Sequence, residues 1–454
     1  KSGLLLAEVV WWYGDDNDGS MLNEEDLSNN VEKKLPRSSK LNGIFVTNEI
    51  MLNEDPITEE KFPLLYKLNK LFEADPHIDE YGLIFGEEEG MEGEAKGFIL
   101  IDHKLGISMS ILQPLYRESR EAFCILRRQW NGGQPVGGRK TGLRRPGRMA
   151  LVQSSRALLL LNPDQYTAWN TRKELILGGY LDAKDELKFL DLVFTKQAKK
   201  PSSWAHRSWC MDYIAKEELV KIDAVVEVGV PPEASAWQLQ QDQEQKKEKM
   251  VAQLIEIADG EFSTCSLVCD RYPRNYYAWR HRAAALRLVA GGRGQAADAK
   301  VLEEMRATTR WMRRHVSDYS ALTYRLGALV AVVQQTRAWD RLNRETYREV
   351  GGASCEHELL FGALARSSLW LDEFPGHEGF WLFRRSVVAW AIEDILAKAS
   401  RNQAKQTGES SLGVDLAPLV DILRALEQAL KMRKEMEERS QREGGGLGQG
   451  EADW

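Results

Sequence analysis

The feature that most constrains the fold is a short motif in which an anchor residue is followed three positions later by arginine. It occurs five times, as NPDQYTAWNTR, AKKPSSWAHR, YPRNYYAWRHR, HVSDYSALTYR and FPGHEGFWLFRR. The anchors and their arginines are Trp169 and Arg172, Trp204 and Arg207, Trp279 and Arg282, Leu322 and Arg325, and Trp381 and Arg384. Recurrence of one spacing along the chain predicts a repeat protein.

Helix geometry explains why the two residues are paired. Residues three apart lie on one face of a helix, so the anchor can pack against a neighbouring helix. The arginine stem then lies beside the anchor, and its guanidinium reaches carboxylates or carbonyls of the next element. Three copies also have proline six residues before the anchor, at Pro163, Pro273 and Pro375. Each unit is therefore predicted to be a helix, a turn and a second helix, stacked on its neighbours as an all-α solenoid.

The distances between anchors indicate where the array is interrupted. They are 35 residues (169 to 204), 75 (204 to 279), 43 (279 to 322) and 59 (322 to 381). The longer intervals contain helix breaks at VGVPPEASAW (228–237) and AGGRGQAAD (290–298), as insertions between stacked pairs would. A tetratricopeptide array fits less well, because its tryptophan lies on the first helix of each pair.

Composition and periodicity divide the chain into five predicted regions. They are an irregular N-terminal extension (1–60), a helical region (61–130), a basic loop rich in glycine and proline (131–149), the repeat solenoid (150–433) and a flexible tail (434–454). Within the second region we expect helices over 62–74 and 111–130, an acidic loop between them, and a short extended run at 98–101. The basic loop is predicted to be a solvated loop, with contact to an anionic surface as the alternative.

Charge and cysteine usage restrict the function classes. The net charge of −7 argues against a nucleic-acid binder, because phosphate contacts need clustered Lys and Arg. Five cysteines without a disulfide pattern favour a reducing, cytoplasmic compartment. Cys265 and Cys269 lie four residues apart, and we expect a buried pair rather than metal ligands. The apolar opening GLLLAEVVWW is too short to cross a bilayer, so we expect no stable membrane insertion.

The sequence P-x-x-Y-x-A-W-x-x-R, present as PDQYTAWNTR and PRNYYAWRHR, resembles the repeat of protein prenyltransferase α subunits. The resemblance covers roughly residues 72 to 385. It implies a right-handed α-α superhelix of helix pairs wrapped around a β subunit of the Rab geranylgeranyltransferase type. In that family the β subunit holds the zinc and the isoprenoid pocket, so no cofactor is expected on this chain. The resemblance further implies geranylgeranyl transfer to acceptor proteins with a C-terminal cysteine.

The resemblance also implies one catalytic candidate. Related α subunits have a lysine five residues before the third anchor, and it reaches the isoprenoid diphosphate. Arg274 has this position here, and it keeps the charge with the geometry of a planar fork. The alternative is a solvated or intersubunit arginine. Lys199 has the same offset in the second copy.

Residues just before the anchors are predicted to contact the partner. Tyrosine at the edge of a solenoid combines apolar area with a hydroxyl group. The candidates are Tyr166, Lys199, Asn275, Tyr276 and Tyr319. The alternative is that they only seal the turns. The sequence thus predicts a non-catalytic α subunit of a heterodimeric prenyltransferase, with an interaction scaffold lacking that activity as the second hypothesis.

Overall fold

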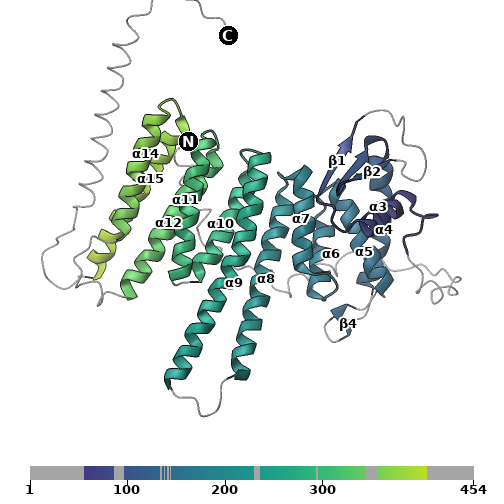
Figure 1. The fold of residues 1–454 in the computed structure, drawn as a ribbon, viewed down its shortest axis with the longest axis horizontal. Helices are drawn as coiled ribbons and strands as arrows, with labels where there is room; N and C mark the ends of the chain where they lie inside the picture. The colour runs from purple at the N-terminus through teal and green to yellow at the C-terminus, as the bar shows by residue number, and fades with distance from the viewer. Residues whose placement is uncertain are drawn as a thin grey trace, which may run out of the picture. The chain divides into compact units, whose positions relative to one another are not determined.

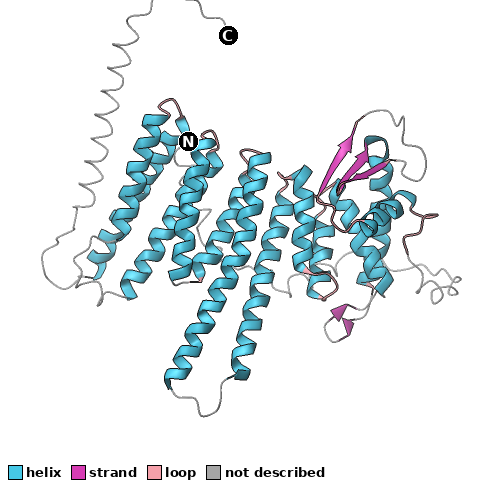
Figure 2. Ribbon diagram, viewed as in Figure 1, coloured by secondary structure: helices cyan, strands magenta, loops and turns pink. Residues whose placement is uncertain are grey.

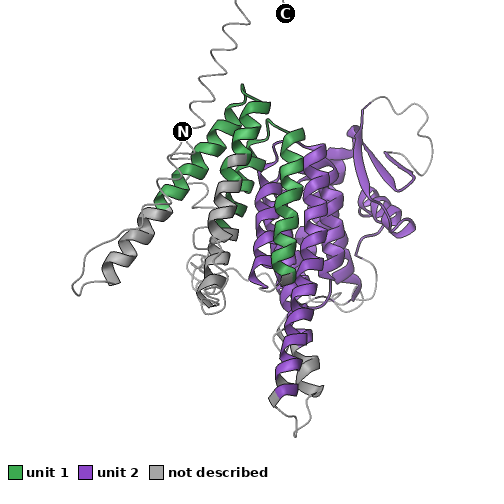
Figure 3. Cartoon of the chain, turned by 60° about the vertical axis from the view of Figure 1, so that its left-hand side comes forward, with its two compact units in different colours: residues 1–17, 295–454 green, residues 18–294 purple. Residues whose placement is uncertain are grey.

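The computed structural model describes residues 56–85, 97–132, 135–136, 139–140, 143, 145–229, 236–292, 295–342 and 355–405. These residues form twelve α-helices and two small sheets (Figures 1 and 2). They fall into two compact units, divided between residues 294 and 295 and coloured in Figure 3. The predicted solenoid therefore spans parts of both units.

The region predicted as helical contains helices and a sheet. Helices α3 (Pro63–Ala74) and α4 (Leu112–Asn131) confirm the two predicted helices. Strand β2 (Phe98–Ile101) confirms the extended run, but β1 (Glu80–Ile84) and β3 (Lys104–Ser108) were not predicted. In the sheet order β1-β3-β2, β3 pairs parallel with β1 and antiparallel with β2. The two missed strands each have a central glycine, and the resulting Gly82–Gly106 pair weakens the strand signal.

The predicted basic loop is partly ordered. Strands β4 (Pro135–Val136) and β5 (Arg139–Lys140) pair antiparallel. Helix α5 begins at Arg145 rather than after residue 149, which corrects the predicted boundary. Pro146 lies in the first helical turn, where proline is tolerated because no helical hydrogen bond is lost.

Three helix pairs follow in the unit that ends at residue 294. They are α5 (Arg145–Leu161) with α6 (Tyr166–Leu177), α7 (Ala183–Gln197) with α8 (Pro201–Gly229), and α9 (Ala236–Arg271) with α10 (Tyr276–Gly291). The break between α8 and α9 confirms the predicted one at 228–237. The insertion has nevertheless lengthened both helices, which project beyond their neighbours in Figure 1. Cys265 and Cys269 are buried in α9 as reduced thiols, as expected of a buried pair.

Two further pairs form the described part of the second unit. They are α11 (Gln295–Arg314) with α12 (Tyr319–Leu342), and α14 (Cys355–Glu373) with α15 (Glu378–Lys405). The break predicted at 290–298 is narrower, since α10 ends at Gly291 and α11 begins at Gln295. The predicted N-terminal extension up to residue 55, the acidic loop at 86–96 and the C-terminal segment from 406 lie outside the described residues.

Candidate functional site

The anchors fasten the second helix of a pair to the turn before it. Trp169, Trp204 and Trp279 are 2–3 % exposed, Leu322 is buried, and Trp381 is partly exposed. Three indoles donate Nε1–H to the carbonyl six residues earlier, over 2.8 Å to Pro163, 2.8 Å to Ala198 and 3.2 Å to Pro375. Each of these tryptophans thus buries apolar area while its polar edge satisfies a turn carbonyl.

The arginines join the two helices of a pair through an interval that is the same in all five copies. Each guanidinium donates from Nη1 to the backbone carbonyl twenty residues earlier, on the first helix. The acceptors for Arg172, Arg207, Arg282, Arg325 and Arg384 are the carbonyls of Val152, Leu187, Phe262, Met305 and Leu364. The motif arginine is therefore a staple within its own helix pair.

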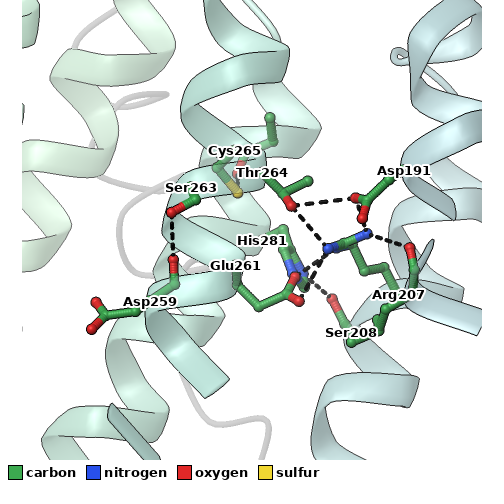
Figure 4. A network of polar contacts seen from close by, with 11 residues as sticks. Asp191, Arg207, Ser208, Asp259, Glu261, Ser263, Thr264, Cys265 and His281 are labelled. Carbon is green, nitrogen blue, oxygen red and sulfur yellow. Dashed lines mark hydrogen bonds and ion pairs between the residues drawn. The ribbon is translucent and has the colours of Figure 1, made fainter. Parts of the chain in front are cut away.

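Two buried glutamates extend the staples from one pair to the next. Glu186 on α7 accepts from Arg172 Nε of the preceding pair (2.7 Å) and from His206 Nε2 of its own pair (2.8 Å). Glu261 on α9 accepts in the same way from Arg207 Nε (2.6 Å) and His281 Nε2 (2.5 Å), as Figure 4 shows. Each glutamate bridges two stacked pairs.

These glutamates were not predicted from the sequence, although the sequence contains a signal for them. Glu186, Glu261 and Glu304 each lie eighteen residues before the anchor of the second, third and fourth copies. Glu304 accepts from the hydroxyl of Tyr324 over 2.7 Å, and Tyr324 is two residues after its anchor, as His206 and His281 are after theirs. If the copies had been aligned on their anchors over the first helix of each pair as well, the recurring glutamate eighteen residues before the anchor would have been visible.

Electrostatics keep both bridging glutamates ionised. Burial raises the pKa of Glu186, but the charge of Arg172 and the hydrogen bond from His206 outweigh burial and hold that pKa at about 2. The pKa of Glu261 is held at about 2 in the same way, against burial, by Arg207 and His281. Burial lowers the pKa of His206 despite its contact with Glu186. A neutral imidazole that donates a hydrogen bond to an ionised carboxylate is consistent with a structural role for this network.

Figure 4 shows that further polar side chains surround the contacts of Glu261. Arg207 also donates to Asp191 Oδ1 (2.8 Å) and to Thr264 Oγ1 (3.1 Å), and Ser208 Oγ lies 2.8 Å from His281 Nδ1. The arginine, glutamate and histidine of this network are nearly inaccessible to solvent. Among the described residues, no three His, Cys, Asp or Glu side chains are grouped to hold a metal ion. We conclude that the motif arginines and histidines stabilise the stack.

The turns before the anchors carry exposed side chains that could bind a ligand or a partner. Arg274 is exposed and has a positive backbone φ of 58°, a conformation uncommon for residues other than glycine. The next residue, Asn275, holds the turn: its Nδ2 donates to Ala198 O (2.8 Å), and its Oδ1 accepts from Ala278 N (3.3 Å). The prediction that Asn275 contacts a partner is wrong, because its side chain is fully buried as a helix cap.

The other four predicted residues also lie at or next to turns before anchors, and one of them, Lys199, contacts the turn of Arg274. Lys199 is exposed, and its Nζ donates to the carbonyl of Pro273 (3.0 Å), the residue before Arg274. Tyr276 is partly buried at the start of α10. Tyr166 is 63 % exposed at the start of α6, and Tyr319 is 45 % exposed at the start of α12. Both tyrosines remain accessible to a partner.

Helix pairs fastened by anchors and arginine staples define an α-solenoid repeat protein. A family model described as "Protein prenyltransferase alpha subunit repeat" matches residues 258–289 and 301–331, within α9–α10 and α11–α12. Human "Protein prenyltransferase alpha subunit repeat-containing protein 1" is 30 % identical over 342 residues, which cover 70 % of this chain and 75 % of the relative. The chain therefore belongs to the protein prenyltransferase α-subunit repeat family, and the predicted α-α superhelix is confirmed.

Two further relatives extend the comparison. The zebrafish (Danio rerio) protein with the same name is 28 % identical over 380 residues, covering 79 % of this chain and 80 % of the relative. "Geranylgeranyl transferase type-2 subunit alpha" of Candida albicans is 24 % identical over 157 residues, covering 29 % of this chain and 42 % of the relative. Among the described helices, none is both long and apolar enough to cross a membrane.

Proposed function

We propose that the chain is the non-catalytic α subunit of a heterodimeric protein prenyltransferase that acts in the cytoplasm. Its partner would be a β subunit of the Rab geranylgeranyltransferase type, which would hold the zinc and the isoprenoid and transfer a geranylgeranyl group to a cysteine of the acceptor protein. Family membership and the name of the Candida relative support this proposal. The structural observation that carries it is the pair of linked, exposed turns at Lys199 and Arg274.

The geometry of these turns suits recognition of an anion. The side chains of Lys199 and Arg274 are both exposed, on turns joined by the Lys199–Pro273 and Asn275–Ala198 hydrogen bonds. These bonds fix the backbones of the two turns that carry the Lys199 and Arg274 side chains. The turns therefore lose little conformational entropy when a diphosphate binds. Arg274 would stabilise the negative charge of the leaving diphosphate, and Lys199 would add to the local positive potential.

Complex formation is the first test. We expect coexpression with a Rab-type β subunit to give a 1:1 complex that survives gel filtration. Tyr166→Ala should weaken the complex, because truncation of an interface tyrosine commonly costs about 1–2 kcal/mol of binding. Trp237→Ala, at an aromatic residue of similar exposure at the start of α9 and away from these turns, is the matched control. A well-folded chain that does not associate with the β subunit would favour the scaffold hypothesis.

The role of Arg274 can be tested in the reconstituted complex. Arg274→Ala should lower kcat for prenyl transfer by about tenfold or more, because a cation that interacts with the leaving group acts in the transition state. Arg274→Lys should restore most of the rate. Arg280→Ala, which removes an exposed arginine from α10, is the control. Unchanged turnover in Arg274→Ala would exclude Arg274 from the mechanism.

A further inference from the structure

A cavity of about 330 Å³ opens between the α6–α7 loop and the face of α8 opposite it. It exists because α8, with 29 residues, is much longer than α6, which has 12 and ends at Leu177. Figure 1 shows α8 continuing beyond the level at which α6 and α7 end. The lining of the cavity includes none of the residues predicted to contact the partner or the diphosphate.

The floor of the cavity is apolar and belongs to the core. Ile176, Ala183 and Ile214 are buried there, and Leu181 and Tyr213 pack against them. Apolar walls around a few placed polar groups are typical of sites that receive a ligand or a side chain. An occupant therefore needs an apolar portion.

The rim of the cavity carries charge that is not balanced within it. Three carboxylates line it (Asp182, Glu217 and Glu218), against the ammonium groups of Lys184 and Lys221. Both ammonium groups form an ion pair with the same carboxylate, Glu218, at 3.1 Å from Lys184 and 3.3 Å from Lys221. The hydrogen bond from Lys184 is the main cause that lowers the pKa of Glu218. Asp182 and Glu217 have no ion-pair partner among the described residues.

The phenol of Tyr213, which also lines the cavity, is affected by these two carboxylates. Burial raises the pKa of Tyr213, and the charge of Glu217, its hydrogen bond and the charge of Asp182 raise it further. The face of a tyrosine ring attracts cations, as carboxylates do. The unbalanced side of the rim is therefore complementary to a positive charge.

The cavity is also preformed, because both ends of the α6–α7 loop are fixed. Gly179 has a φ of 71°, and its N–H donates to Ile176 O (2.9 Å), while the N–H of Tyr180 donates to Leu175 O (2.8 Å). These bonds form a Schellman motif at the end of α6. Asp182 then caps α7 by accepting from the N–H groups of Lys184 and Asp185. A preformed site loses little entropy on binding.

We infer that this cavity is a socket for a lysine or arginine side chain from a basic segment of a partner protein. The aliphatic stem lies along Leu181 and Ile214, and the cationic end lies between Asp182 and Glu217 beside Tyr213. A purely apolar side chain leaves the two carboxylates without a counter-ion, and an acidic one is repelled by them. The inference does not depend on the prenyltransferase proposal, since no β subunit takes part.

Fluorescence polarisation with the purified chain tests the socket. The probe is a fluorescein-labelled peptide of six Gly-Lys repeats, compared with peptides in which norleucine or glutamate replaces lysine, in 150 mM salt. We expect binding of the lysine peptide alone. Glu217→Lys should weaken it about tenfold, because one attractive contact becomes repulsive. Glu248→Lys, on an exposed stretch of α9, makes the same change of net charge and should weaken it less than twofold, because salt screens distant charges.

Each contrary result overturns the inference. Equal weakening by Glu217→Lys and Glu248→Lys would show attraction to overall charge, and equal binding of the norleucine peptide would show an apolar site. Absence of binding by the lysine peptide would remove the socket altogether. Glu217 is exposed, so its replacement should leave the fold intact. Circular dichroism and melting temperature must confirm this for both variants.

Discussion

Buried arginines are neutralised differently in the two units of the molecule. In the unit that ends at residue 294, Arg172 and Arg207 each meet a glutamate from the next helix pair. In the other unit, Arg325 is also buried, and among the side chains that the structure describes it donates to the carbonyl and sulfur of Met305 and to Thr308 Oγ1, all within its own pair. Among the described residues no carboxylate lies within ion-pair distance of Arg325.

One residue accounts for the difference. Position 363, eighteen residues before the fifth anchor, is alanine where the second and third copies have Glu186 and Glu261. The effect on basicity follows: burial and the charge of Arg366 lower the pKa of Arg325 to about 10, whereas Glu261 and Asp191 raise the pKa of Arg207 despite burial. The staple to a carbonyl is thus the constant part of the repeat, and the bridge between pairs is optional.

The largest expected effect is removal of a bridge where it exists. Glu186→Gln keeps the shape of the side chain but leaves the charge of Arg172 buried without a counter-ion, and we expect a loss of about 3–5 kcal/mol in unfolding free energy. Urea denaturation followed by circular dichroism measures it. The control is Glu303→Gln, which breaks an exposed pair with Lys300 and should change stability by less than about 0.5 kcal/mol. A similar loss in both variants would contradict the comparison.

Acid should weaken the bridged unit by a similar amount for each glutamate. The folded-state pKa values of Glu186 and Glu261, about 2, lie below the ordinary value of 4.5. Their contribution is therefore complete above about pH 4.5 and is lost as the pH falls towards 2, by about 3 kcal/mol for each glutamate. The lowered pKa of His206 acts in the same direction below its ordinary value of 6.5. Melting temperatures from pH 7 to pH 3 should fall less steeply in a Glu186→Gln, Glu261→Gln double variant than in the wild type.

A third, smaller effect concerns the leucine anchor. A Cβ atom on Gly379 of α15 would lie 2.8 Å from Leu322 Cδ1, so the backbone of α15 closely approaches this anchor. We expect Leu322→Trp to overfill the space and to lower stability by about 1–3 kcal/mol, although tryptophan is the usual anchor. Differential scanning calorimetry would detect the shift. A melting temperature equal to or above that of the wild type would show that the leucine is not dictated by packing.

The smallest expected effect is installation of the missing bridge. Ala363→Glu places a carboxylate at the position that Glu186 and Glu261 have in their copies. We expect stabilisation by about 1 kcal/mol, because the ion pair with Arg325 must offset the desolvation of the new carboxylate. Ala363→Gln, similar in shape but neutral, should not stabilise. If both variants destabilise equally, position 363 is not equivalent to positions 186 and 261.

Periodic features could be predicted from the sequence, and features that depend on distant partners could not. The anchor–arginine spacing correctly gave the helix pairs, because both residues lie on one face of one helix. The glutamates were missed because they lie eighteen residues before the anchors, outside the motif, and because Glu186 and Glu261 reach arginines of another pair, 14 and 54 residues away. Strands β1 and β3 were missed because each is only five residues long with a central glycine, and because each is completed by pairing with other strands, β1 with β3 and β3 with both β1 and β2.

The candidate site was predicted in part. The positions of Arg274, Lys199, Tyr166 and Tyr319 at the turns followed from their distance to the anchors. Asn275 was wrongly assigned to the partner surface, because asparagine at the start of a helix can serve the helix itself. The positive φ of Arg274 was not predicted, because glycine and asparagine are the residues that usually mark this conformation.

Each motif arginine lies twenty residues after the carbonyl that it contacts. This constant interval limits where the chain can gain residues. An insertion inside one of these windows, such as 152–172 or 187–207, would shift an arginine away from its acceptor. An insertion outside them leaves every staple in register. The elongated α8 and α9 arose between two windows, from 208 to 261. New segments, and the binding surfaces they bring, can therefore accumulate in this molecule only at the joints between helix pairs.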